Sequence, residues 1–301
     1  MTVPGEAPSI DDLSALREAL AAVPVDDSSE RARELRSRLL AELEGHLIPR
    51  VAHPQAPIVV ALTGPTGSGK STLVNGLASS VVTPAGALRP TTRTPVLVHR
   101  PEDTRWFPGE RRRVPAWATV HTVTSAKLPP GVALLDTPDV DSARDGTPGY
   151  TEHLLAAADV WLFVTTATRY ADAAPWQTLR AAGGRRADLA VVLDRVQPEA
   201  ADSLHEALQQ LLQQHGLIEA SLLVVAETAL TDDGQLPGPS VAPVRTWLES
   251  LAAGGTRRAG VLQRTIAGAV AALGEPVIEL ARLTGAEPRL RQAAQAVGSL
   301  P

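Results

Sequence analysis

Short apolar runs alternate with helical segments through the middle of this chain. The runs have the length and the Val, Ile and Leu content of strands that are buried on both faces of a sheet. They predict strands at residues 58–62, 95–99, 117–124, 131–136, 159–167, 189–194 and 221–227, and the segments between them predict helices at about 70–79, 151–158, 174–183, 199–214 and 241–252.

Strands that alternate with helices are typical of the α/β class. We therefore expect a doubly wound, mostly parallel sheet of six or more strands within residues 55–254, covered by helices on both faces. In such a fold a ligand binds beyond the carboxyl ends of the strands.

The residues before this region predict two helices, at 9–22 and 27–49. Asp27 and Glu30 have the spacing of a capping box, and leucines follow at intervals of four. This stripe of leucines needs an apolar partner surface, and we assign residues 1–54 to an N-terminal helical segment.

The residues after about 254 are rich in alanine and have apolar positions spaced by three or four. We assign residues 255–301 to a C-terminal helical segment, in which Gly274 and Pro276 predict a kink. Two arrangements remain open: this helix lies on the sheet, or it forms a bundle with the leucine stripe of the N-terminal segment.

A glycine-rich loop follows the first predicted strand and precedes a predicted helix. The sequence GPTGSGKS at residues 64–71 satisfies G-x-x-x-x-G-K-[ST], the phosphate-binding loop, in the strand and helix context that this motif requires. Glycines let the backbone approach phosphates, and the helix N-terminus adds positive potential. The candidate nucleotide-binding residues here are Gly64, Gly67, Ser68, Gly69, Lys70, Ser71 and Thr72.

The phosphate loop predicts a magnesium site beside it. Lys70 is expected to reach the β- and γ-phosphates, and Ser71 to bind Mg²⁺ through its hydroxyl. Asp136 ends the strand of residues 131–136 and is the expected carboxylate, acting on the metal through a water. Thr92, with Thr91 as the competing choice, is expected to close over the γ-phosphate and the metal. The predicted catalytic residues are thus Lys70, Thr92 and Asp136, and the predicted metal ligands are Ser71, Thr92 and Asp136.

Composition and charge limit the classes of protein to consider. The formal net charge is −5, without a long basic block, so nucleic acid is not the expected partner. The chain has no cysteine, which excludes disulfides and thiolate metal sites and favours the cytoplasm, with a peripheral membrane position as the alternative. No apolar stretch is long enough to predict a membrane span, and the N-terminus does not read as a secretory signal.

Four segments together resemble the translation-factor-related class of GTPases and, within it, the bacterial dynamin-like family. GPTGSGKSTLVNGL at 64–77 resembles the phosphate loop and first helix of that class, and TRTPVL at 92–97 resembles the dynamin switch stretch. LLDTPD at 134–139 resembles the metal-binding strand, and the stretch from 158 to 176 is similar to the fourth strand and following loop of bacterial dynamin-like proteins. The resemblance covers about residues 58–230 and makes residues 55–254 a P-loop GTPase domain.

Three departures from that family lie near the phosphates. Asp139 stands where the family has glycine, which places a carboxylate near the γ-phosphate. Val140 stands where small signalling GTPases keep a glutamine that orients water, and an aliphatic side chain cannot do so. Gly67 stands where dynamins have serine, so the cation-dependent mechanism of that family is not expected to transfer unchanged.

A fourth departure concerns the base. The expected N/T-K-x-D is replaced by Asp194-Arg195-Val196-Gln197. Arg195 can stack on the base, but Gln197 offers a single carbonyl where the family's aspartate accepts two hydrogen bonds from guanine. Asp194 is the alternative acceptor if the loop shifts, so Asp194 and Arg195 join the candidate nucleotide-binding residues.

Two further segments have competing interpretations. Ser125-Ala126-Lys127 imitates the last GTPase motif but precedes Asp136, so we place the true counterpart at 226–228. Tyr170 and Trp176 either belong to the core or form a contact surface for a second GTPase domain.

The resemblance implies a Mg²⁺-dependent enzyme that hydrolyses GTP to GDP and phosphate, slowly alone and faster when a second copy or another partner completes the site. A nucleotide-gated scaffold with little hydrolysis is one alternative, which Asp139 and Val140 motivate, and a P-loop ATPase is another. GTP and GDP are the expected ligands, with a homodimer or hetero-partner through the GTPase domain. Any membrane association is expected to be indirect or peripheral.

Overall fold

The computed structural model describes residues 8–26, 28–85, 94–107, 111–113, 119–138, 154–170, 176, 179 and 188–298. The chain forms two compact units. The larger comprises residues 56–183 and 187–261, and the smaller comprises residues 1–55, 184–186 and 262–301. The predicted boundaries at 54/55 and 254/255 stay predictions.

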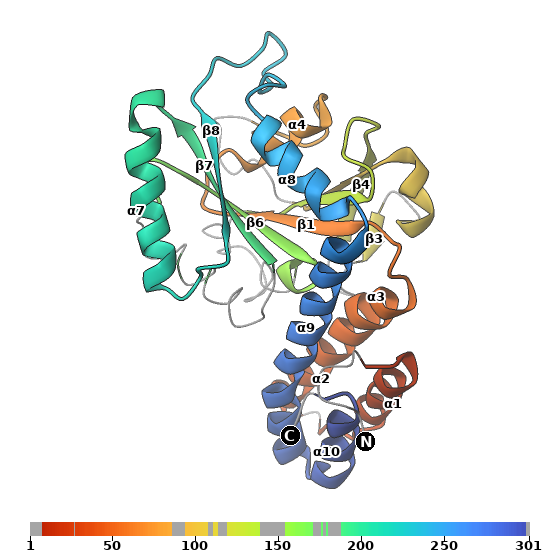
Figure 1. The fold of residues 1–301 in the computed structure, drawn as a ribbon. Helices are drawn as coiled ribbons and strands as arrows, with labels where there is room; N and C mark the ends of the chain where they lie inside the picture. The colour runs from red at the N-terminus through yellow and green to blue at the C-terminus, as the bar shows by residue number, and fades with distance from the viewer. Residues whose placement is uncertain are drawn as a thin grey trace. The chain divides into compact units, whose positions relative to one another are not determined.

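The larger unit contains an eight-stranded sheet among the described residues, in the order β3-β4-β2-β5-β1-β6-β7-β8 (Figure 1). The β2–β5 and β3–β4 pairs are antiparallel and the other pairs are parallel. The mostly parallel α/β fold is therefore confirmed. The strands are β1 Ile58–Thr63, β2 Val96–His99, β3 Arg111–Arg113, β4 Thr119–Thr124, β5 Val132–Asp136, β6 Val160–Thr166, β7 Asp188–Val196 and β8 Ser221–Ala226.

All seven strands predicted from apolar runs are present, and β3 is the strand that the pattern did not predict. It consists of three consecutive arginines, so it has neither an apolar run nor an alternation that would mark a strand. Its pairing with the edge of β4 makes it a strand, and tertiary pairing of this kind has no local signature.

Alternating side chains of the central strands form two hydrophobic cores, one on each face of the sheet. Ile58, Val60 and Leu62 of β1 belong to the core covered by α4 (Lys70–Ala78) and α8 (Ala242–Ala252), whereas Ala61 belongs to the opposite core. That opposite face is covered by α7 (Ala201–Gln214) through Leu208 and Leu212, and Figure 1 shows α7 away from α4 and α8. Two short 3-10 helices, Pro101–Trp106 (η2) and Pro198–Ala200 (η4), also belong to this unit.

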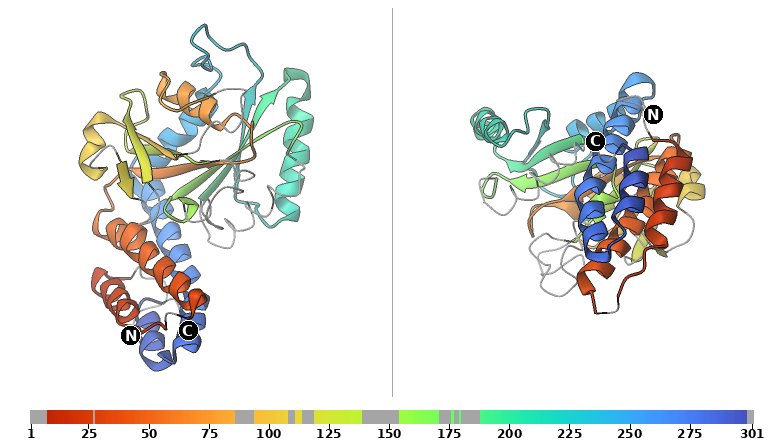
Figure 2. Two further views of the ribbon diagram at one scale, coloured as in Figure 1. Left: turned by 180° about the vertical axis from the view of Figure 1, so that it is seen from behind. Right: turned by 90° about the horizontal axis from the view of Figure 1, so that it is seen from below.

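The smaller unit is a helical bundle built from both ends of the chain. Its N-terminal part comprises α1 (Ile10–Ala21), α2 (Glu30–Glu42), the π-helical turn η1 (Leu43–Leu47) and α3 (Ile48–Ala52). Its C-terminal part comprises α9 (Gly255–Thr284), of which residues 262–284 belong to this unit, and α10 (Glu287–Ala296). Figure 2 shows the red and orange N-terminal helices beside the blue C-terminal ones.

One hydrophobic core joins these helices, which decides between the two arrangements left open by the sequence. Leu35, Leu39, Leu43 and Leu47 of the leucine stripe share this core with apolar residues of α9 and α10. At the surface, Arg31 Nε and Nη2 of α2 donate to the two carboxylate oxygens of Glu279 on α9, at 2.8 and 3.1 Å. The bundle alternative is therefore confirmed.

Local details bear on two of the predictions. The second helix begins at Glu30 with Ser29 as its N-cap, and the Ser29 side chain makes no capping hydrogen bond; Asp27, which we predicted to cap it, lies outside the described residues. α9 continues through Gly274 and Pro276, and the predicted kink there stays a prediction.

Of the helix predicted at 151–158, residues 154–156 are helical, whereas the helix predicted at 174–183 lies largely outside the described residues. Within the described part of the chain, no helix combines the length and the apolar character needed to cross a membrane.

Shortening Leu280 should destabilise the helical bundle. The Leu280 side chain is fully buried in its core, whereas Leu283 on the same helix is 49% exposed. We expect Leu280→Ala to lower the free energy of unfolding by about 2–5 kcal/mol, and Leu283→Ala to lower it by less than about 1 kcal/mol. Urea denaturation of the full chain measures both, and equal effects of the two substitutions would contradict the assigned core.

Candidate nucleotide-binding site

The loop between β1 and α4 has a backbone that favours glycine at three positions. Gly64, Gly67 and Gly69 have φ angles of 143°, 75° and 96°, in the region that side chains other than glycine rarely adopt. A Cβ on Gly64 would lie 2.1 Å from the carbonyl oxygen of Val164 in β6, so the loop passes directly against the neighbouring strand. The glycines of the motif thus permit both the turn and the close packing of the loop on the sheet.

Lys70 is the first residue of α4 and is buried at 5% exposure. Its Nζ donates to the carbonyl oxygens of Gly64 and Pro65 at 2.9 and 3.1 Å, which places the ammonium group under the loop. A cation held there faces the space in which the loop motif binds phosphates.

Two other contacts fix the loop itself. Arg169, just after β6, donates from Nη1 to the carbonyl oxygen of Thr66 at 2.8 Å. The Ser68 N–H donates to Pro65 O at 3.2 Å, so this amide makes a hydrogen bond within the loop.

The hydroxyl of Ser68 is a polar atom without a hydrogen-bond partner among the described residues. Ser68 is fully buried, and its Oγ lies 3.3 Å from the position that a Cβ on Gly64 would take. A buried hydroxyl left unpaired costs free energy, and a bound phosphate oxygen in the loop is the kind of acceptor that would satisfy it.

Ser71 and Asp136 meet at the mouth of this loop. Ser71 Oγ donates to Asp136 Oδ2 at 2.8 Å. The contact follows from the parallel pairing of β1 with β5, in which Leu62 is the partner of Asp136, so that the carboxyl end of β5 lies beside the loop. The pattern of strands therefore brings together two residues that are far apart in the sequence.

Thr83 is a third member of this cluster that the sequence analysis did not identify. Its Oγ1 donates to the same Asp136 oxygen at 2.7 Å. Asn75 of α4 holds Thr83 in place, because its side-chain oxygen accepts from the Thr83 N–H at 3.0 Å and its amide donates to the Thr83 carbonyl at 3.0 Å. A threonine in an irregular segment has no periodic signal, so only the fold could reveal it.

The oxygen atoms of Ser71 and Asp136 fit a magnesium ion. Mg²⁺ prefers oxygen ligands and is usually held by one or two carboxylates together with substrate phosphates and water. The 2.8 Å separation of the two oxygens allows both to contact one ion or one of its water ligands. No group of three or more His, Cys, Asp or Glu side chains suited to a metal occurs elsewhere in the described residues.

Asp194, near the end of β7, packs against the other side of the loop. A Cβ on Gly69 would lie 2.4 Å from Asp194 Oδ2, and Asp194 is 7% exposed. Burial raises the pKa of the Asp194 carboxyl above its ordinary value; the Arg195 backbone N–H and guanidinium oppose this effect, and the charge of Glu227 adds to it. Asp194 thus supports the phosphate loop.

Arg195 adopts a left-handed backbone conformation, with φ of 57°, and contacts the phosphate loop. Its Nε is 3.6 Å from Asp194 Oδ2, and its Nη2 donates to the carbonyl oxygen of Gly67. The guanidinium is therefore anchored at the phosphate loop.

Gln197 and Glu227 join the segments that follow β7 and β8. Gln197 Nε2 donates to Glu227 Oε2, and the Glu227 N–H donates to Val196 O at 2.9 Å. We placed the counterpart of the last GTPase motif at residues 226–228, but no local signal indicated that the Glu227 side chain would contact Gln197.

Several predicted residues cannot be placed. Thr91, Thr92, Asp139 and Val140 lie outside the described residues. The roles of the predicted site residues in binding and catalysis stay predictions.

Trp176 belongs to the core and does not form a contact surface. It is 4% exposed, its ring stacks on His215 with centroids 4.4 Å apart, and its Nε1 donates to Tyr170 O at 3.1 Å. Tyr170 is partly buried against the same core. The core interpretation of these two aromatic residues is therefore the correct one.

Replacing Gly69 by alanine should disrupt the phosphate loop. The new Cβ would meet Asp194 Oδ2 at 2.4 Å in a backbone conformation that costs alanine about 1–2 kcal/mol. We expect Gly69→Ala to weaken binding of a fluorescent GTP analogue by at least about tenfold, as about 1.4 kcal/mol would. Gly238→Ala is the control, because a Cβ there has nothing within 4 Å; unchanged affinity in Gly69→Ala would contradict the loop geometry.

Replacing Asp194 by asparagine should change the pH dependence of stability. Because the folded protein holds the Asp194 proton more tightly than the unfolded chain does, wild-type stability falls as pH rises through the raised pKa. We expect Asp194→Asn to have the higher Tm at pH 7 and the difference to shrink as pH falls toward 4. Thermal unfolding from pH 4 to 8, with the exposed Asp232→Asn as control, tests this, and a gap that widens on acidification would refute it.

Comparisons with known proteins agree with this fold. The sequence model of the family described as 50S ribosome-binding GTPase matches residues 59–226, more than half of the chain. No curated protein sequence matches the chain.

Several solved structures are similar. A chain of an oligomerised bacterial dynamin pair has a TM-score of 0.49 at 14% identity, with 94% of this chain and 57% of that chain covered. Era from Aquifex aeolicus bound to GDP·AlF4− has a TM-score of 0.38 at 19% identity, covering 56% and 50%. Era in complex with MgGDPNP and nucleotides of 16S ribosomal RNA has a TM-score of 0.40 at 18% identity, covering 57% and 52%. This chain therefore spans 57% of the length of the bacterial dynamin chain that it resembles.

The match covers β1, the phosphate loop, β5 with Asp136, and β6 to β8, which are the elements that build the site. GTP binding is the property that this family indicates. The chain belongs to the 50S ribosome-binding GTPase family, with a P-loop GTPase domain of mostly parallel α/β fold.

Proposed function

We propose that this protein is a Mg²⁺-dependent GTPase that hydrolyses GTP to GDP and phosphate. The observation that carries the proposal is the contact of Ser71 Oγ with Asp136 Oδ2 at 2.8 Å, beside a phosphate loop with a buried lysine under it. These are the groups needed to hold a triphosphate and its metal ion.

Each residue of the site would have its own role in binding the triphosphate and the metal ion. Lys70 would neutralise the β- and γ-phosphates, and Ser71 and Asp136 would hold the metal ion, with Thr92 as a further ligand. The bound Mg²⁺ would supply charge neutralisation at the phosphate that is cleaved. Thr83, through its hydrogen bond to Asp136, would keep the carboxylate oriented toward Ser71.

Hydrolysis by the isolated chain is expected to be slow. Val140 stands where small signalling GTPases keep a glutamine that orients water, and no aliphatic side chain can take that role. A second copy of the chain or another partner would then complete the site through the GTPase domain.

We further propose a dynamin-like organisation in which the helical bundle transmits the nucleotide state. The support is that segments on both sides of the GTPase domain share one hydrophobic core, so that the bundle depends on both ends of the chain. Cytoplasmic localisation, with peripheral attachment to a membrane through a partner, goes with this proposal.

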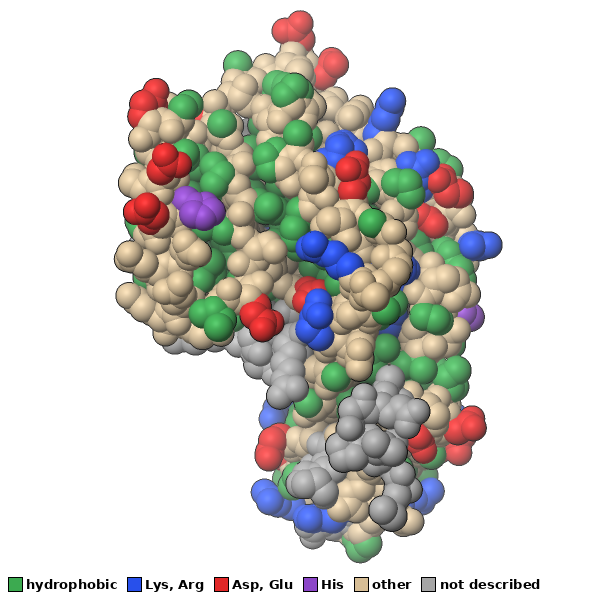
Figure 3. All heavy atoms as spheres, in the orientation of Figure 1, with side chains coloured by type: hydrophobic (Ala, Val, Ile, Leu, Met, Phe, Trp, Pro, Cys, Tyr) green, Lys and Arg blue, Asp and Glu red, His purple; other side chains and the backbone are tan. Residues whose placement is uncertain are grey.

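Binding to RNA is the competing proposal. The family is described as 50S ribosome-binding GTPase, and one of the similar Era structures contains ribosomal RNA. The net charge of −5 and the intermixed acidic and basic side chains on the face shown in Figure 3 favour a partner other than nucleic acid. Retention on ribosomal RNA at physiological salt would favour the RNA alternative.

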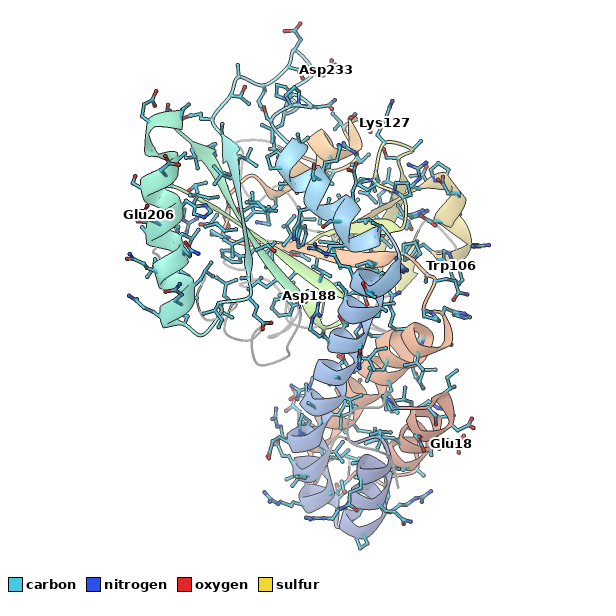
Figure 4. The ribbon with its side chains drawn as sticks, viewed as in Figure 1. Glu18, Trp106, Lys127, Asp188, Glu206 and Asp233 are labelled. Carbon is cyan, nitrogen blue, oxygen red and sulfur yellow. The ribbon has the colours of Figure 1, made fainter. Side chains whose placement is uncertain are left out.

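Removing Lys70 should abolish nucleotide binding. We expect Lys70→Ala to weaken GTP binding by at least about 100-fold, because two or more charge-assisted contacts with phosphate are lost. Lys127→Ala is a matched control: Lys127 is the other lysine of the chain, lies at the surface in Figure 4, and should leave the affinity unchanged. The measurement is titration with labelled GTP in the presence of Mg²⁺, with ATP as competitor.

Three results would overturn parts of the proposal. Absence of GTP binding, or equal affinity of Lys70→Ala and wild type, would refute the nucleotide site. Equal competition by ATP would favour the ATPase alternative. Tight GTP binding without phosphate release that depends on Asp136 would favour the nucleotide-gated scaffold.

A further inference from the structure

We propose that Glu227 supplies the carboxylate that recognises guanine in this protein, in place of the aspartate that the base motif lacks. The inference rests on the proposed function, because it assigns the base-binding end of the same GTP site. It adds a residue that determines specificity, outside the N/T-K-x-D position that recognises the base in related GTPases.

Guanine requires acceptors along one edge. Its ring N–H and its 2-amino group are donors, whereas adenine has an unprotonated ring nitrogen at the corresponding ring position and no 2-amino group. A carboxylate accepts through both oxygens and donates nothing, so it favours guanine and repels the adenine edge. A protein of this fold without such a carboxylate would leave the guanine donors unpaired.

Asp194 is not available for this role. Its carboxylate is buried against the phosphate loop, where Oδ2 lies 2.4 Å from the position of a Cβ on Gly69. To reach a base it would have to leave that packing and its neighbour Arg195. The alternative that Asp194 replaces the missing aspartate is therefore disfavoured by the geometry.

Gln197, which occupies the position of the missing aspartate, does not act alone. Its Nε2 donates to Glu227 Oε2, so the amide group that would face the guanine donors is directed to the carboxylate instead. The Gln197 carbonyl oxygen and the Glu227 carboxylate then form a combined set of acceptors. Because of this hydrogen bond, the Gln197 amide donor does not face the guanine donors, and acceptor oxygens are left for them.

Glu227 also has the right position and exposure. The parallel pairing of Val196 with Ala226 brings the ends of β7 and β8 together, and the Glu227 N–H donates to Val196 O at 2.9 Å. The side chain is exposed, as a group that meets a ligand must be. Arg195, which precedes Val196 in β7, donates to Gly67 O of the phosphate loop, so contacts through Arg195 and Val196 connect the phosphate loop to Glu227.

The test compares nucleotides that differ only in the 2-substituent. ITP lacks the 2-amino group of GTP, and XTP has an acceptor oxygen there. We expect wild type to bind GTP about tenfold or more tightly than ITP. The 2-amino group of GTP would donate a hydrogen bond to the carboxylate, and ITP cannot form this bond. Affinities for GTP, ITP, XTP and ATP are measured by displacement of a fluorescent GTP analogue, with Mg²⁺ present.

Glu227→Gln is the informative variant. It keeps the size of the side chain but removes the charge and introduces a donor. We expect its GTP affinity to fall about tenfold, the ratio of GTP to ITP affinity to approach one, and XTP to gain relative to GTP. Glu219→Gln, at an exposed glutamate before the opposite end of β8, is the matched control and should behave as wild type.

The outcomes separate this inference from the proposed function. If wild type binds no GTP, the proposed function fails and this inference with it. If wild type binds GTP but Glu227→Gln retains the wild-type ratio of GTP to ITP affinity, only the role of Glu227 is refuted. Glu227→Asp, which keeps the charge on a shorter side chain, should retain a preference for GTP over XTP, and its loss would also count against the carboxylate.

Discussion

The parallel pairing of β1 with β5 is the constraint on which the site depends. It places Asp136 opposite Leu62, one residue from the end of β1, and thereby beside the helix that begins at Lys70. The hydrogen bond from Ser71 to Asp136 is a consequence of this register, because a shift by one residue would turn the aspartate to the other face of the sheet. The contact between Ser71 and Asp136 is thus only as well defined as the packing of apolar side chains around these two central strands.

The phosphate loop is held from several directions by groups that the motif itself does not contain. Val164 of β6, Arg169 after β6 and Asp194 of β7 all contact it. The glycines are needed where these groups come closest. A side chain at Gly64 would overlap the Val164 carbonyl oxygen of β6, and one at Gly69 would overlap the Asp194 carboxylate of β7. The loop is therefore shaped by its surroundings as well as by its backbone preferences.

The two carboxylates near the base end differ in environment, and this decides their roles. Asp194 is buried against the loop and has a raised pKa, whereas Glu227 is exposed and pairs with Gln197. The buried carboxylate supports the phosphate loop, and the exposed one is the group that we propose for recognition of guanine. The helical bundle is a separate structural problem, because it needs apolar surface from both ends of the chain.

The sequence by itself determined the strands, the phosphate loop and the identity of Lys70, Ser71 and Asp136 as a possible set, because apolar periodicity and glycine spacing are local signals. It also supplied the leucine stripe, but left open whether its partner was the C-terminal helix. Only the tertiary structure decided that pairing, the strand β3, the contact of Thr83 with Asp136 and the contact of Gln197 with Glu227. These features join residues that are distant along the chain or lie in irregular segments, and their side chains meet only when strand order and helix packing are fixed.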